Sequence, residues 1–154
     1  MTVQVKRWKC AEGSSTVEFS LIAVIFVMLL LGVIEMGRMI LAYTTIAQAA
    51  KAGARYAIVH GSLRSGGGAS GPSGPGNTTQ IETVVKNFAS AGALNTVNVT
   101  TTVTYPTVSG TCGTNGPGCP VQVKVTYPFT PLLSYFNPML SMTLSSTSKG
   151  AITF

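Results

Sequence analysis

Charged side chains are scarce in this sequence. Asp, Glu, Lys and Arg make up 9% of its 154 residues, against roughly 25% in an ordinary soluble protein. Four acidic residues and one histidine leave little material for acid–base catalysis or for a metal site. Hydrophobic residues, in contrast, reach 45%. We therefore expect a chain that lies partly in a membrane or in a protein assembly, is not an enzyme and uses no cofactor.

The positive charges are unevenly placed, and the formal net charge is +6. Lys6, Arg7 and Lys9 form a short basic head, whereas the other basic residues are scattered along the chain. The sequence lacks a basic patch interleaved with aromatic residues, which is the pattern typical of nucleic-acid binding. This distribution predicts that nucleic acid is not a partner.

An apolar run follows the basic head. No charged residue occurs from Phe19 to Ile34, and as a helix this stretch spans roughly 24 Å, short of the roughly 30 Å hydrocarbon core of a bilayer. A start at Ser14 lengthens the span to roughly 31 Å but draws Glu18 into the edge of the bilayer, where a carboxylate needs a partner. The basic head predicts a cytoplasmic N-terminus and an exported C-terminal part.

Three ordinary export signals compete for this stretch. The apolar run of a secretory signal peptide has only about 7–15 residues, and Ile34, Glu35 and Met36 do not supply the small residues of its cleavage site. A lipoprotein signal ending at Cys10 would need an apolar segment before that cysteine, which the sequence lacks. An uncleaved signal anchor remains a possible interpretation, although it does not explain the presence of Glu18.

The order of the parts points to a more specific signal. A basic head, Gly13, small residues, Glu18 and an apolar helix follow one another, and this order resembles the class III leader of type IV pilins and pseudopilins. Three motifs narrow the resemblance to the TadE-like family of minor pilins from tight-adherence (Tad) pilus systems. They are "VEFSLI" at Val17–Ile22, "GVIEMGRMILAY" at Gly32–Tyr43 and "AAKAGARYA" at Ala49–Ala57.

The resemblance implies roles for three residues near the N-terminus. A prepilin peptidase would cut between Gly13 and Ser14 and remove the leader. Glu18 would then pair, in the filament, with the free α-amino group of a neighbouring subunit, and a buried polar pair of this kind fixes register more than it adds stability. Many type IV pilins begin with a methylated Phe, which cannot be carried over because Ser14 stands here.

The function that the resemblance implies is structural. The chain would be a minor pilin or pseudopilin that takes part in assembling a Tad-type (type IVc-like) pilus for adhesion. Its expected partners are a prepilin peptidase, other major and minor pilins, the inner-membrane assembly platform and, before assembly, membrane lipid. It would cross the bacterial inner membrane once and then enter a cell-surface pilus. Two alternatives stay open: an uncleaved single-pass envelope protein with a small exported binding domain, and a secretion-system pseudopilin.

Composition divides the chain into four parts. We expect a leader at 1–13, a long helix at 14–60, a Gly/Ser/Pro-rich flexible loop at 61–76 and a small α+β part at 77–154. The first half of the long helix would span the membrane. Where the helix leaves the membrane, Glu35 and Arg38 have a spacing that lets them pair on one face.

Residue periodicity predicts a pilin-like α+β fold for the rest of the chain. A second helix is expected at Thr79–Ala91, with Thr79 and Glu82 in capping-box spacing and Ile81, Val84, Val85 and Phe88 on one face. Alternating residues predict a three-stranded antiparallel sheet with one buried face. Its inward residues would be Val97, Val99, Val103 and Tyr105, then Val121, Val123, Val125 and Tyr127, then Leu140, Met142 and Leu144.

A stripe of small residues marks the outer half of the long helix. Ala49, Gly53 and Ala57 recur every four residues, and small side chains let another backbone approach closely. We expect this stripe to pack against the protein's own sheet, with a contact to a neighbouring subunit as the alternative.

The cysteines agree with export. Cys10 would leave with the leader, whereas Cys112 and Cys119 stand close together in a loop between two strands. A disulfide there would stabilise the fold by roughly 2–3 kcal/mol and implies an oxidising compartment. A metal site is the alternative, but it needs two more ligands, and the single histidine, His60, is far away in sequence. We expect His60 instead to complement the dipole at the end of the long helix.

Overall fold

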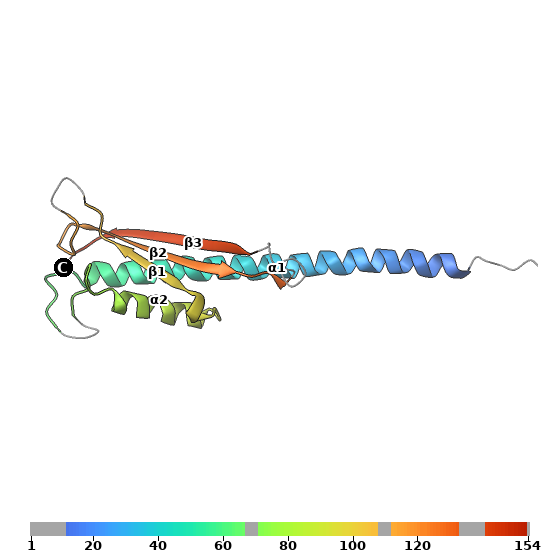
Figure 1. Ribbon diagram of the computed structural model, residues 1–154, viewed down its shortest axis with the longest axis horizontal. Coiled ribbons are helices and arrows are strands. Elements are labelled where there is room, and N and C mark those ends of the chain that lie inside the picture. The colour runs from blue at the N-terminus through green and yellow to red at the C-terminus, as the bar shows by residue number, and fades with distance from the viewer. Residues whose placement is uncertain (1–11, 67–70, 108–111, 133–140, 154) are drawn as a thin grey trace, which may run out of the picture. The chain divides into compact units, whose positions relative to one another are not determined.

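The computed structural model describes residues 12–66, 71–107, 112–132 and 141–153. Its elements, in chain order, are α1 (Glu12–Val59), α2 (Thr79–Ala91), the 3₁₀ helix η2 (Thr96–Asn98), β1 (Thr100–Thr104), β2 (Pro120–Phe129) and β3 (Met142–Ala151) (Figure 1). Together with a disulfide between Cys112 and Cys119, these elements confirm the predicted α+β fold. The basic head, Cys10 and Leu140 lie outside the described residues.

Helix α1 contributes to two compact units, which divide between Gly37 and Arg38. Its sequence contains no proline and is rich in Ala, Leu and Met, which have high helix propensity. The second unit, residues 38–154, contains the C-terminal part of α1, α2 and the sheet.

Strand β2 is the centre of the sheet and pairs antiparallel with both β1 and β3. Val123 of β2 lies opposite Val103 of β1. Val121, Val123 and Val125 are fully buried, whereas Lys124 is exposed. The predicted alternation in this strand is therefore confirmed.

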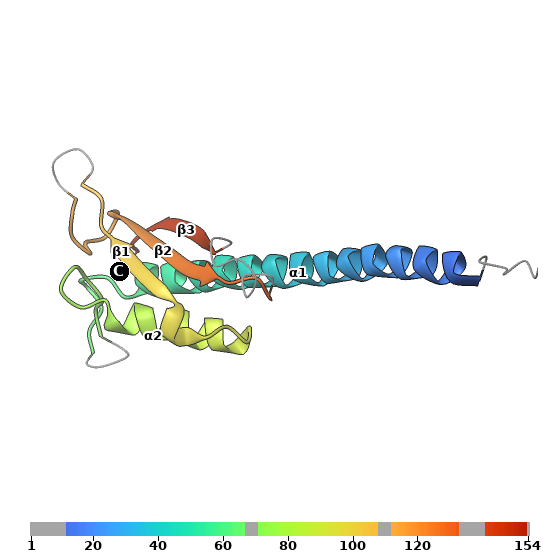
Figure 2. The ribbon, with the colours of Figure 1, turned by 45° about the vertical axis from the view of Figure 1, so that its right-hand side comes forward.

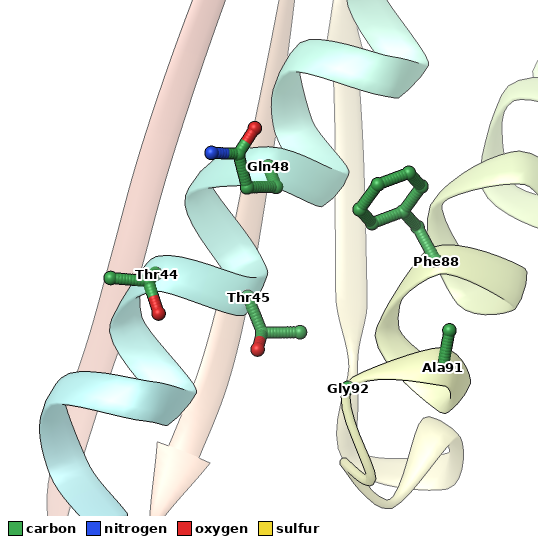
Figure 3. Close-up of a pocket in the computed structure, with 6 residues that line it drawn as sticks. All are labelled: Thr44, Thr45, Gln48, Phe88, Ala91 and Gly92. Atoms are coloured by element: carbon green, nitrogen blue, oxygen red, sulfur yellow. The ribbon is translucent and has the colours of Figure 1, made fainter. Parts of the chain in front are cut away.

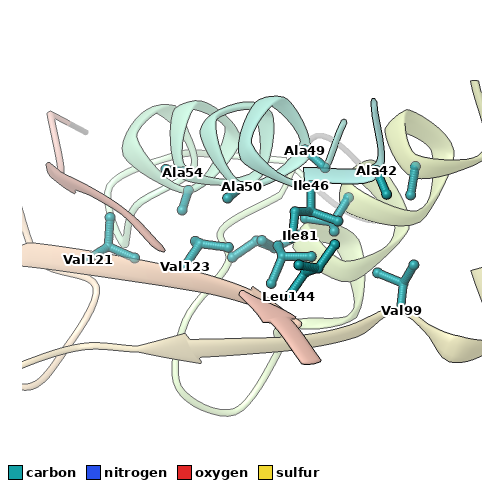
Figure 4. Packing of buried hydrophobic residues seen from close by; sticks show 14 of the residues in the cluster. Ala42, Ile46, Ala49, Ala50, Ala54, Ile81, Val99, Val121, Val123 and Leu144 are labelled. Carbon is teal, nitrogen blue, oxygen red and sulfur yellow. The ribbon is translucent and has the colours of Figure 1, made fainter. Parts of the chain in front are cut away.

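The C-terminal part of α1 and helix α2 cover the buried face of the sheet (Figures 1 and 2). A Cβ atom added to Gly53 of α1 would meet Val85 of α2 and Val123 of β2, so three elements converge at this glycine. Figure 4 shows part of the cluster. The whole cluster consists of Ala42, Ile46, Ala49, Ala50, Ala54 and Ala57 from α1, Ile81, Val85 and Ala89 from α2, and Val99, Val121, Val123, Val125, Phe129, Leu144 and Ile152. The small-residue stripe thus packs within the protein's own core, as predicted.

Helix α2 has the predicted bounds but differs in its cap and its inner face. Its N-cap is Thr78 rather than Thr79, and the Thr78 hydroxyl donates to the Glu82 carboxylate at 3.1 Å. The predicted Thr79–Glu82 capping box is therefore wrong, because the N-cap is Thr78 and its side chain makes no capping hydrogen bond to a backbone N–H. The buried face repeats every four residues, through Ile81, Val85 and Ala89, whereas Val84 is half-buried and Phe88 is exposed.

The first strand starts later than the alternation predicted. Val97 is 88% exposed and belongs to η2, because the Asn95 side chain accepts a hydrogen bond from the Val97 N–H at 3.1 Å and starts a turn there. Met142 is also exposed, whereas Leu144 is buried. The buried residues of the sheet therefore begin with Val99, just before β1, and with Leu144 in β3.

Candidate functional site

The N-terminal part of α1 presents an almost continuous apolar surface. Phe19 and Met28 are 73% and 70% exposed, and the helix is long and apolar enough to cross a membrane. The other exposed apolar residues there are Val17, Leu21, Ile22, Val24, Ile25, Phe26, Val27, Leu29, Leu30, Leu31, Val33, Ile34 and Met36. A helix that is apolar all round is stable only when lipid or other apolar helices surround it.

Glu18 interrupts this apolar surface. Its side chain is exposed, and Val17 and Phe19 on either side are exposed as well. Gly13, Ser14 and Glu18 all belong to α1, and Ser14 precedes Glu18 by four residues in the sequence. A carboxylate in such a surface calls for a cation. Cleavage after Gly13 would supply one, the new α-amino group at Ser14, and this role stays a prediction.

Arg38 makes a contact that the sequence did not reveal. Its guanidinium carbon lies 5.8 Å from the centroid of the Phe129 ring. Phe129 ends β2, far from Arg38 in sequence, so local periodicity holds no signal for this cation–π contact. The pairing of Glu35 with Arg38 stays a prediction.

Cys112 and Cys119 form the predicted disulfide, with their Cα atoms 5.4 Å apart. This pairing uses the two cysteines on which the alternative metal site depended. Among the residues that the structure describes, no group of three or more His, Cys, Asp or Glu side chains could hold a metal ion.

His60 follows the last residue of α1 and forms hydrogen bonds to Tyr56 in that helix. Its N–H donates to the Tyr56 carbonyl at 3.1 Å, and its Nδ1 lies 2.9 Å from the same oxygen. The imidazole also stacks on the Tyr56 ring, with centroids 3.8 Å apart. Because a carbonyl only accepts, Nδ1 must be the donor. His60 therefore satisfies a carbonyl at the end of the helix, and its effect on the helix dipole stays a prediction.

The Gly/Ser/Pro-rich loop is tied to the disulfide loop. Ser73 is 1% exposed, and its hydroxyl donates to the His60 carbonyl at 3.0 Å. The Asn115 side-chain amide donates to the Ser73 carbonyl at 2.9 Å, and the Asn115 carbonyl accepts from the Ser62 N–H at 2.9 Å. Burial raises the pKa of the nearby Tyr105 hydroxyl, and the Ser73 side chain opposes that shift. Composition predicted a flexible loop, whereas the described parts are held at several points.

An open groove of about 390 Å³ lies between α1 and α2 (Figure 3). Its lining residues are Thr44, Thr45, Gln48, Phe88, Ala91 and Gly92. None of these side chains titrates near neutral pH, and the Thr45 hydroxyl already donates to the Leu41 carbonyl at 2.8 Å. The lining therefore gives the two threonine hydroxyls no titratable side chain that could act as a general base.

Comparison with known proteins bears on the N-terminal helix. Residues 13–55 match a protein family described as "TadE-like protein". The matched range includes Gly13, Glu18 and Arg38 and leaves out the sheet. No curated protein and no solved structure matches the chain. The match confirms the TadE-like resemblance over this segment.

Proposed function

We propose that the chain is a TadE-like minor pilin or pseudopilin, which a prepilin peptidase processes and which takes part in assembling a Tad-type pilus for adhesion. One observation carries the proposal: the first part of α1 exposes apolar side chains all round, whereas its last part builds the core of an α+β unit. A subunit that moves from lipid into a bundle of helices needs both properties in one helix. The proposed role is structural rather than catalytic.

In this proposal the apolar surface of the N-terminal part of α1 contacts first lipid and then other pilins. Before assembly, lipid surrounds the N-terminal part of α1, the N-terminus is cytoplasmic and the disulfide-containing part is exported. After assembly, apolar helices of other pilins replace the lipid. This exchange gains little from the hydrophobic effect, because lipid tails are as apolar as the helices. Specific contacts, such as one between Glu18 and a neighbour's α-amino group, would therefore decide the register.

Two rival functions use the same helix differently. An uncleaved single-pass envelope protein would keep its basic head and would never leave the bilayer. A secretion-system pseudopilin would be cleaved but would build no surface fibre. The TadE-like match favours a Tad pilus over both. The proposed partners are the prepilin peptidase, other major and minor pilins, and the inner-membrane assembly platform.

Cleavage between Gly13 and Ser14 tests the proposal directly. Mass spectrometry of protein from the envelope should find a mature N-terminus at Ser14. Gly13→Leu should leave the precursor uncut, because a bulky side chain would stand at the scissile bond. Gly32→Leu is the matched control, since a Cβ at Gly32 meets no atom within 4 Å, and it should be cleaved normally. An assembled protein that still begins at Met1 or Thr2 would contradict the proposal.

A further inference from the structure

The side of the sheet that points away from α1 and α2 carries polar side chains (Figures 1 and 2). Directly opposed residues of antiparallel strands project their side chains from the same side of the sheet, so the strand register defines rows across it. Two neighbouring rows consist of Thr102, Lys124 and Thr147 and of Thr104, Gln122 and Lys149. We call these six residues the polar face.

The polar face is accessible to a partner. Five of its six residues are exposed, and Gln122 is half-buried. Within the described parts of the chain, no hydrogen bond or ion pair joins any of these six side chains to another residue. The next row differs, because the Thr126 hydroxyl donates to the Thr100 carbonyl at 3.2 Å.

The chemistry of the polar face suits a long molecule rich in hydroxyl groups. Threonine hydroxyls and the glutamine amide both donate and accept hydrogen bonds, and each lysine ammonium has three donors. Neighbouring strands lie roughly 4.8 Å apart, and rows two residues apart lie roughly 6.7 Å apart along a strand. These groups therefore form a flat grid, whereas a small ligand favours a concave site. A polysaccharide can lie across such a grid and meet several of its groups at once.

The charge of the polar face selects an anionic partner. Lys124 and Lys149 are its charged residues, and they are diagonal neighbours on adjacent strands, at roughly 7–8 Å. In the sequence, the unit formed by residues 38–154 has seven basic residues and one acidic residue, Glu82, which belongs to α2. The polar face therefore complements carboxylates that recur along a polymer.

Other anionic partners fit the polar face less well. Single-stranded nucleic acids stack their bases on aromatic side chains, and none of the six residues is aromatic. A surface that lies in the membrane interface combines cations with apolar side chains, which these six residues also lack. The core of a protein–protein interface is typically enriched in aromatic residues and depleted in lysine. These differences favour a polysaccharide.

We infer that the polar face binds an anionic polysaccharide that carries carboxylates along its chain. Lys124 and Lys149 contact the carboxylates, while Thr102 and Thr147, on either side of Lys124, form hydrogen bonds with sugar hydroxyls. One such site is weak, because exposed ion pairs contribute little, but several copies on one polymer gain avidity. The inference deepens the proposed function by naming the class of target for adhesion, and that role rests on the proposed function.

The test measures binding of the full chain, in uncharged detergent, to a sensor coated with polygalacturonate. A second sensor carries the methyl ester of the same polymer, which keeps the sugar backbone but has no charged carboxylates. We expect the wild-type chain to bind polygalacturonate with a Kd at least about tenfold lower than that for the ester. The double variant Lys124→Gln/Lys149→Gln should raise the Kd for polygalacturonate about tenfold, the effect of two exposed ion pairs.

The matched control is the double variant Lys51→Gln/Lys86→Gln. It removes the same charge from exposed positions of α1 and α2 rather than from the sheet, and its Kd should stay within about twofold of the wild type. Equal losses in the two double variants would overturn the inference, since they would mean a non-specific charge effect. A wild-type chain that does not bind polygalacturonate, or that binds duplex DNA as tightly, would overturn it as well.

The threonine hydroxyls distinguish sugar recognition from attraction of charge alone. Thr102→Val/Thr147→Val keeps every charge and suits a strand, and it should raise the Kd about threefold or more. Thr102→Ser/Thr147→Ser keeps the hydroxyls and should bind like the wild type. Circular dichroism and thermal unfolding confirm that each variant is folded. A folded valine variant with the wild-type Kd would overturn the sugar contacts and with them the inference.

This experiment can fail independently of the proposed function, because it needs no pili. A chain that is processed at Ser14 but does not bind polygalacturonate contradicts this inference alone. A chain that binds polygalacturonate but is never processed contradicts the proposed function and leaves a polysaccharide-binding envelope protein.

Discussion

Gly53 and Val85 approach so closely that a Cβ atom on Gly53 would lie 2.7 Å from Val85 Cγ2. The same atom would lie 3.3 Å from Val123 Cγ1 of the central strand. Glycine inside a helix costs about 1 kcal/mol relative to alanine, so its presence calls for a reason. The close contact among α1, α2 and β2 supplies that reason.

Gly53→Ala should lower the free energy of unfolding. The added methyl group overpacks the core, at a cost of typically 1–3 kcal/mol, which exceeds the gain of about 1 kcal/mol in helix propensity. Chemical denaturation of the full chain in detergent measures the change. Gly37→Ala is the control, because a Cβ there meets nothing within 4 Å, and it should be neutral or stabilising. A Gly53→Ala variant as stable as the wild type would contradict the described contact.

Loss of the Cys112–Cys119 disulfide should destabilise the exported part. A ring this short contributes roughly 2–3 kcal/mol in the chain-entropy model. The double Cys→Ser variant should also loosen the loop that carries Asn115, and with it the hydrogen bonds to Ser62 and Ser73. Non-reducing peptide mapping of protein from the envelope should find the two cysteines linked. Free thiols at both positions would show that the bridge does not form.

Ala93 offers a test of backbone strain. Its φ of 59° lies in the left-handed region, which costs a residue with a Cβ roughly 1–2 kcal/mol. Ala93→Gly relieves this strain, but glycine loses roughly 0.5–1 kcal/mol more conformational freedom on folding. The free energy of unfolding should therefore rise by about 0.5–1 kcal/mol, the difference between the two effects. Ala93→Val should lower it, because a β-branched residue tolerates this region least. Thermal unfolding of both variants measures the sign of each stability change. A less stable Ala93→Gly variant together with a more stable Ala93→Val variant would contradict the assigned backbone conformation.

Local sequence patterns predicted helix α1, the central strand β2 and helix α2. The long apolar run predicted α1, and the alternation of Val121, Val123 and Val125 predicted the central strand. The bounds of α2 followed from its periodicity and from Gly92 behind it. In these cases the residues that form an element also carry its pattern.

Val97 fits the alternation of a strand, but the Asn95 side chain two residues earlier caps a 3₁₀ turn there, and asparagine is a residue type that favours caps, so this signal was local. Features that depend on contacts between distant segments were missed as well. The contact of Arg38 with Phe129 joins a helix to a strand end. Composition likewise suggested a flexible loop around Ser73, which hydrogen bonds instead hold in place. Such contacts form only after the chain has folded, so no local sequence pattern predicts them.

Glu18 distinguishes an assembly subunit from a simple membrane anchor. In an anchor, Glu18→Ala removes the desolvation cost of a carboxylate, so insertion should improve or stay the same. In a filament, the same change leaves a neighbour's α-amino group buried without its partner, which costs roughly 3–5 kcal/mol. At about 1.4 kcal/mol per factor of ten, incorporation should fall by two to three orders of magnitude. Cleavage should survive, because the bond after Gly13 is untouched.

The ratio of Glu18→Ala variant to wild type in purified pili, normalised to the membrane pool of each, is the most direct measurement of this claim. Glu82→Ala serves as the control, because Glu82 belongs to α2 and not to the apolar part of α1, and its ratio should stay near that of the wild type. We expect the Glu18→Ala ratio to fall at least a hundredfold, the lower limit set by the energy of an unpaired buried charge. An unchanged Glu18→Ala ratio with normal pili would contradict the account and leave Glu18 as an ordinary carboxylate at the membrane interface.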